Sequence, residues 1–221
     1  MEQNQPPFGD QLEQLSGLLL RIGGRCEQAI GLAVTALVDR DSGVADQVIR
    51  GDAEIDSLEL EIDSLCMEIL ARHQPMARDL RLITTVIKIT PDLERIADYA
   101  VNISQRALEL NEEGPLKALI DIPLMARHAQ KMVRDALDAF VREDADAARA
   151  VILMDDELDR RLEQTFRLLL SHMIEDPTTI SRCLRMMFAA KSIERIGDQA
   201  TNVCEQIVYM CEARVIKHGR F

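Results

Sequence analysis

Residues 94 to 102 of the chain read E-R-I-A-D-Y-A-V-N, and residues 194 to 202 read E-R-I-G-D-Q-A-T-N. The offset between the two segments is 194 − 94 = 100 residues, and it holds at every position of the pattern. Each segment places Glu, Asp and Asn at intervals of four residues, and residues four apart lie on the same face of an α-helix. The chain therefore contains one helical element twice, and each copy carries two acidic side chains on one face.

A second pair of matching segments lies upstream of the first pair. Asp52 and Asp56 correspond to Asp155 and Asp159, at an offset of 155 − 52 = 103 residues. Further positions match at the same offset: Ala36, Val38, Val48 and Ile49 correspond to Ala139, Val141, Val151 and Ile152. The two offsets differ by three residues, so the second copy is shorter by three residues between its second and third helices. We conclude that the chain is a tandem repeat.

Apolar residues recur every three or four positions along most of the chain. One such stripe contains Val86, Ile89, Leu93, Ile96, Ala100, Ile103 and Ala107. Aromatic residues make up only 3% of the sequence and Trp is absent, so the core must consist of aliphatic residues and Met. Stripes with this spacing are typical of long amphipathic helices packed as a bundle.

Helix-ending residues divide these stripes into six segments. The breaks fall at Asp41–Ser42, Gln74–Pro75, residues 111–115, Asp144 and Asp176–Pro177. We expect Ser42 to cap the second helix and Asp176 to cap the sixth, before a Pro at its first position. The sequence predicts an all-α fold, with six long antiparallel helices forming two tandem three-helix bundles. The first repeat would span residues 1–113 and the second residues 114–221.

Eight acidic residues stand out because both repeats keep them at matching positions. They are Asp52, Asp56, Glu94 and Asp98 in the first repeat, and Asp155, Asp159, Glu194 and Asp198 in the second. They border the apolar stripes, where carboxylates repel one another and acquire raised pKa values unless a cation compensates them. Arg95 and Arg195 turn away from this ridge by about 100°, so we expect them to be poor partners for both acids. We interpret each group of four as a metal site, with structural salt bridges as the alternative.

The chemistry of these side chains limits the metals and reactions to consider. All the ligands are oxygens, which suits Mg²⁺, Ca²⁺, Mn²⁺ or iron and is atypical of Zn²⁺. The E-x-x-H spacing of di-iron bundles is absent, and so is a glycine-rich phosphate loop. Nothing in the sequence indicates catalysis. Pro91 stands where the second copy has Lys191, and it predicts a kink in the helix just before Glu94. This kink would either adjust the geometry of the first metal site or be tolerated without a function.

The overall charge and the terminal sequence exclude several classes of protein. The formal net charge is −12, which disfavours nucleic-acid binding. The N-terminus lacks a signal sequence, and no apolar run approaches the ~18 residues that would cross a bilayer. The five Cys show no C-x-x-C spacing. We therefore expect a soluble, cytoplasmic protein without membrane insertion.

The segment I-K-I-T-P-D-L-E-R-I-A-D-Y-A-V-N from Ile87, its copy S-I-E-R-I-G-D-Q-A-T-N, and Q-P-M-A-R-D-L-R from Gln74 resemble the signature of the PhoU family. The resemblance covers essentially the whole chain. This sequence departs from the family pattern at Pro91 and at Ala97, where Gly is more usual.

The resemblance implies a cytoplasmic negative regulator of phosphate uptake and of phosphate-starvation signalling. Such a protein would act through the ATPase subunit of the high-affinity phosphate ABC transporter and through a sensor histidine kinase, and it would often be a homodimer. The resemblance also implies iron, or Mg²⁺, Mn²⁺ or Zn²⁺, at the eight acids. A carboxylate-bridged metal enzyme and a metal-free helical scaffold remain alternative functions.

Overall fold

The computed structural model describes residues 7–116 and 122–216, and these residues are almost entirely helical, without a strand. The elements are α1 (Phe8–Asp39), α2 (Ser42–His73), α3 (Ala77–Asn111), α4 (Ile122–Arg142), α5 (Ala145–Ile152), α6 (Asp155–Glu175), the 3₁₀ helix η1 (Pro177–Thr179) and α7 (Ile180–Glu212). No helix within these ranges is long and apolar enough to cross a membrane. The predicted all-α fold is confirmed.

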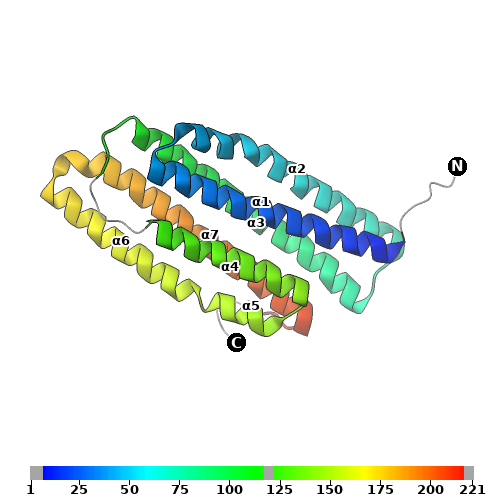
Figure 1. The fold of residues 1–221 in the computed structure, drawn as a ribbon. Helices are drawn as coiled ribbons and strands as arrows, with labels where there is room; N and C mark the ends of the chain where they lie inside the picture. The colour runs from blue at the N-terminus through cyan, green and yellow to red at the C-terminus, as the bar shows by residue number, and fades with distance from the viewer. Residues whose placement is uncertain (1–6, 117–121, 217–221) are drawn as a thin grey trace.

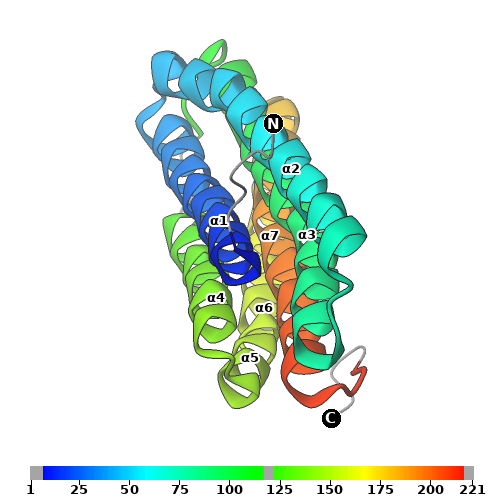
Figure 2. The ribbon, with the colours of Figure 1, turned by 90° about the vertical axis from the view of Figure 1, so that its right-hand side faces the viewer.

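The helices form two bundles that pack side by side. Helices α1, α2 and α3 contact one another in the first bundle, and α4, α5, α6 and α7 form the second. The contacts of α3 with α7 and of α1 with α4 join the two bundles. Figure 1 shows these four helices between α2 and α6, which lie along opposite edges of the molecule, and Figure 2 shows α1 next to α4 and α3 next to α7. The tandem arrangement predicted from the repeat is therefore correct.

The fifth predicted helix is divided in two, which the sequence analysis did not anticipate. The break lies at Leu153 and Met154, where the backbone tightens without leaving the right-handed helical region. The Met154 N–H donates to the carbonyl of Val151 (2.9 Å), and the Glu157 N–H donates to the carbonyl of Met154 (3.2 Å). These three-residue hydrogen bonds start a new helix at Asp155, so acidic residues occupy its first turn and complement the helix dipole.

The capping residue of α2 differs from the prediction. Asp41, and not Ser42, is the N-cap: one carboxylate oxygen accepts from the N–H groups of Gly43 and Val44. Ser42 is already the first helical residue, whereas Asp41 has the extended backbone that an N-cap requires. The prediction for Asp176 is correct only in part: Asp176 caps the 3₁₀ helix η1, with Pro177 in the first position, whereas the N-cap of the long helix α7 is Thr179.

A small residue allows the second and third helices of each repeat to approach closely. A Cβ atom added at Gly197 of α7 would lie 2.5 Å from Cδ2 of Leu158 and 3.1 Å from Oδ1 of Asp155, both on α6. In the first repeat Ala97 replaces this Gly and Ile55 replaces Leu158 (158 − 55 = 103), and both are buried. The first repeat therefore combines a larger residue on its third helix, Ala97, with a residue on its second helix, Ile55, that has no second δ-carbon like that of Leu158.

We expect Gly197→Ala and Leu158→Ile to be energetically coupled. Overpacking by the new methyl group costs about 1–3 kcal/mol, partly offset by the roughly 1 kcal/mol helix preference of Ala over Gly. Leu158→Ile should relieve the clash by restoring the pair found in the first repeat. The double variant should therefore unfold with a free energy above the additive expectation by about 1 kcal/mol or more, measured by chemical denaturation. Additive losses would contradict this packing interpretation.

Candidate metal centres

The first group of predicted ligands comes together at the seam between α2 and α3. Burial raises the pKa of Glu94 to about 7, and the charges of Asp98, Asp56 and Asp52 contribute. Burial, followed by the charges of Asp56 and Asp98, also raises the pKa of Asp52. Carboxylates raise one another's pKa values when they lie close together in a poorly solvated place. The structure therefore places all four acids in one cluster, which we call the first acidic cluster.

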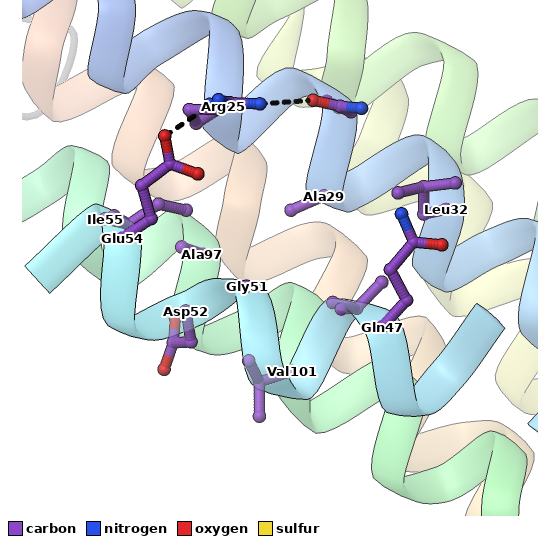
Figure 3. Close-up of a pocket in the computed structure, with 12 residues that line it drawn as sticks. Arg25, Ala29, Leu32, Gln47, Gly51, Asp52, Glu54, Ile55, Ala97 and Val101 are labelled. Atoms are coloured by element: carbon purple, nitrogen blue, oxygen red, sulfur yellow. Dashed lines mark hydrogen bonds and ion pairs between the residues drawn. The ribbon is translucent and has the colours of Figure 1, made fainter. Parts of the chain in front are cut away.

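Two neighbouring acids of α2 point in different directions, and only one joins the cluster. Figure 3 shows Glu54 reaching towards α1, where Arg25 Nη2 donates to Glu54 Oε1 at 2.7 Å. Asp52 points away from α1 in the same view. Glu54 is therefore neutralised by a surface ion pair, whereas Asp52 faces the acids of α3.

The first acidic cluster has no cation of its own. Within the described ranges, Asp52, Asp56, Glu94 and Asp98 make no ion pair. Burial raises the pKa of Asp92 to about 6, although the charge of Arg95 acts on this carboxyl and lowers its pKa. This agrees with the expectation that Arg95 is a poor partner for Glu94 and Asp98. A proton or an external cation is then the available means of compensating the repulsion.

Glu59 also belongs to this neighbourhood, although the sequence analysis missed it. Burial raises the pKa of Glu59, and the charges of Asp63, Asp56 and Asp98 raise it further. Its spacing from Asp52 and Asp56, seven and three residues, places it on the same helix face. The repeat did not indicate Glu59, because the matching position of the second repeat is occupied by Leu162 (162 − 59 = 103).

The second group of predicted ligands forms an equivalent cluster between α6 and α7. Burial raises the pKa of Asp155 to about 7, with contributions from Asp198, Asp159 and Glu194. Glu194 is only 6% exposed, an unusual degree of burial for a carboxylate. Asp155 Oδ1 and Glu194 Oε2 are buried without a hydrogen-bond partner. Buried carboxylate oxygens in this condition favour a cation or a proton as a partner.

The second acidic cluster, unlike the first, is partly neutralised by basic side chains. Lys191 Nζ donates to Glu194 Oε1 (2.5 Å), and Arg195 Nη1 donates to Asp198 Oδ2 (3.1 Å). Arg195 Nε also lies 4.0 Å from Glu194 Oε2. The expectation that Arg195 is a poor partner for both acids is therefore wrong, because its long side chain reaches Asp198 one turn further along and stays within 4.0 Å of Glu194. Lys191 has no equivalent in the first repeat, where Pro91 stands instead.

Comparison with known proteins agrees with the repeated architecture. The family model of the PhoU domain matches the chain twice, at residues 19–107 and 122–207. The chain belongs to the PhoU family.

Similar proteins of this family carry names that refer to phosphate transport. The chain is 43% identical over 212 residues to the "Phosphate-specific transport system accessory protein PhoU homolog" of Pseudomonas putida, covering 96% of this chain and 83% of that protein. It is 38% identical to the "Phosphate-specific transport system accessory protein PhoU" of Escherichia coli, covering 96% and 88%.

The similarity extends to a solved structure. The crystal structure of PhoU from Pseudomonas aeruginosa superposes with a TM-score of 0.90 at 43% identity, covering 94% of this chain and 100% of that one.

The donor set of this PhoU-family chain fits a hard cation, but the side chains are not arranged as a finished cage. No three His, Cys, Asp or Glu side chains among the described residues are placed to hold one ion together. Asp56, Asp98 and Asp159 are exposed and can change rotamer, whereas Asp155 Oδ1 and Glu194 Oε2 are buried and accept no hydrogen bond. All available ligands are carboxylate oxygens, which prefer Mg²⁺, Mn²⁺ or iron to Zn²⁺.

The raised pKa of Glu94 predicts a pH-dependent stability in the presence of a chelator. Because the pKa is about 7 in the folded chain and 4.5 ordinarily, the folded state holds the proton more tightly than the unfolded state. The free energy of unfolding should therefore fall as pH rises through the interval between these values. Glu94→Gln should flatten this slope and stabilise the protein above pH ~7, as measured by denaturation at a series of pH values.

Glu112→Gln, an exposed charge change at the C-terminal end of the same helix, is the matched control. The pH slope of this control should stay close to that of the parent protein. If Glu94→Gln left the pH dependence of the free energy of unfolding unchanged, this result would contradict a raised pKa of Glu94 at the seam.

Proposed function

We propose that this protein is a cytoplasmic accessory protein of phosphate transport that negatively regulates phosphate uptake and phosphate-starvation signalling. Its membership of the PhoU family is the observation that carries the proposal. The regulated partners would be the ATPase subunit of the phosphate ABC transporter and a sensor histidine kinase. A helical protein can serve such a role without catalysis, by presenting the outer faces of its bundles to its partners.

The protein would bind its partners as a homodimer, through faces that the two bundles leave uncovered. Large apolar side chains are exposed on α6 and α7, among them Phe166, Leu170, Leu184 and Phe188. These exposed apolar side chains are our candidates for the interaction surface, because apolar groups on an interface lose contact with water when a partner binds. The absence of a membrane-crossing helix among the described residues agrees with docking to a membrane complex from the aqueous side.

The eight acids would hold metal ions, with iron as the first candidate and Mg²⁺, Mn²⁺ or Zn²⁺ as alternatives. When bound, the metal would supply positive charge between the second and third helices of each repeat. Asp52 and Asp56 would then be held to Glu94 and Asp98 by attraction to a common ion, instead of repelling them. The uncompensated first acidic cluster should bind more tightly than the second, because Lys191 and Arg195 compete for Glu194 and Asp198.

Metal analysis tests this difference between the clusters. Anaerobically purified protein should contain metal, and Glu94→Gln with Asp98→Asn should remove more of it than Glu194→Gln with Asp198→Asn. Lys191→Gln should strengthen binding at the second acidic cluster, since one competing cation is lost. Element analysis and Mn²⁺ titration followed by electron paramagnetic resonance measure both effects.

The alternatives make different predictions in the same experiment. Metal content unaffected by all four acid substitutions would favour a metal-free helical scaffold, in which salt bridges like those of Lys191 and Arg195 account for the acids. Turnover of a substrate that depends on the acids would favour a carboxylate-bridged metal enzyme.

A pull-down with the transporter ATPase tests the regulatory role. We expect the purified protein to retain the ATPase in a manner that depends on phosphate concentration, because a regulator of uptake must respond to phosphate supply. The amount of ATPase retained at high and low phosphate is measured, with an unrelated helical bundle of similar charge as the control. Lack of retention at both concentrations would remove the main support for this function.

A further inference from the structure

A groove lined by basic side chains lies where the two repeats meet, between α3 and α7. It has a volume of about 360 Å³. Its lining residues are Tyr99, Asn102 and Arg106 of α3, and Phe188, Lys191, Ser192 and Arg195 of α7. The two helices are antiparallel here: Arg185 of α7 contacts Glu109 of α3, whereas Arg81 of α3 reaches the carbonyl of Met210 on α7. Side chains from both repeats therefore share one cavity.

The lining carries three cationic groups and no carboxylate. The side chains of Arg106, Lys191 and Arg195 are 30%, 44% and 50% exposed, so a ligand in solution can reach them. Each also contacts an acid on its own helix: Arg106 contacts Glu109, and the other two contact acids of the second acidic cluster. A guanidinium has five N–H donors and an ammonium has three, so the contacts of these side chains with acids leave further donors that can face the groove.

The repeat provides an internal comparison for this groove. The positions that correspond at the offset of 100 residues are Lys88, Pro91, Asp92, Arg95, Gln199, Asn202 and Gln206. This set contains only two cations and an acid, and Lys88 lies over the ring of Tyr209 at 5.0 Å. Both sets of positions lie on the same pair of repeated helices, α3 and α7, but only one of them carries three cations. The basic lining is specific to the groove that contains Arg106 and Lys191.

We propose that the α3–α7 groove binds a phosphoryl group, either as inorganic phosphate or as part of a nucleotide. Arg and Lys side chains joined by hydroxyl and amide donors match a tetrahedral anion that carries several acceptor oxygens. The cavity volume falls within the range of small-molecule sites. Phe188 lines the same groove, and its exposed ring offers a surface on which a nucleotide base can stack. The proposed ligand would not need a metal, because none of the lining residues is one of the eight acids, although Lys191 and Arg195 also contact the second acidic cluster.

Isothermal titration of the purified full-length protein tests this proposal, and EDTA in the buffer excludes binding through a metal. Inorganic phosphate and ATP are titrated separately, with sulfate as a comparison anion. We expect saturable binding that weakens as salt is added. Arg106→Gln should weaken this binding at least about tenfold. Lys191→Gln should also weaken it, which provides a second variant on the other helix. Circular dichroism checks that each variant is folded.

Two further variants make the result specific. Arg95→Gln removes the residue of the first repeat that corresponds to Arg195. Because Arg95 does not line the groove, this variant should bind nearly as well as the parent protein. Phe188→Ala separates the two sources of the phosphoryl group: it should weaken ATP binding if a nucleotide base stacks there, and it should leave inorganic phosphate unaffected.

Three outcomes would overturn the proposal. The first is the absence of saturable binding by both phosphate and ATP. The second is an equal loss in Arg95→Gln and Arg106→Gln, which would indicate nonspecific attraction. The third is binding that requires added metal and is lost in Glu194→Gln but kept in Arg106→Gln, because the anion would then be bound through the metal at the acidic cluster.

Discussion

The close approach of the second and third helices within each repeat determines where the acids of this protein lie. Gly197 leaves room for Leu158, and the contact brings Asp155 of α6 against the ridge of α7 that carries Glu194 and Asp198. Because the seam is narrow and apolar on its inner side, carboxylates on its border lose solvent and meet one another. Their raised pKa values are a direct consequence of helix packing.

Internal duplication is why so much of this arrangement could be predicted from the sequence. Periodic apolar positions define long helices, and matching offsets identify acids that packing alone does not require. Features without a repeated signal were missed. Glu59 faces the first acidic cluster but corresponds to Leu162, and the break before Asp155 has no capping side chain or Pro to mark it. Arg195 was misjudged because helix spacing describes where a side chain starts, and a long side chain can end one turn away.

The two clusters have the same acids but a different balance of charge. Glu194 is the more buried of the equivalent pair, and it has Lys191 beside it. Glu94 is more accessible and has Pro91 at that position, which supplies neither charge nor a hydrogen-bond donor. The second repeat therefore relieves repulsion with its own side chains, whereas the first leaves it to a proton or a cation. A duplicated site need not remain two copies of one function.

Lys191 and Arg195 lie at the boundary between the second acidic cluster and the α3–α7 groove, and they contribute to both. A cation held by Glu194 and Asp198 would take over the acids that these two side chains now contact. Their charges would then be more fully available to an anion in the groove, and an anion there would in turn draw them away from the acids. Two sites that share charged residues in this way favour each other's ligands by the same free energy, because thermodynamic linkage is reciprocal. A metal-binding PhoU-family protein with a phosphoryl site at this groove would thus have a physical route between the two ligands that requires no rearrangement of its helices.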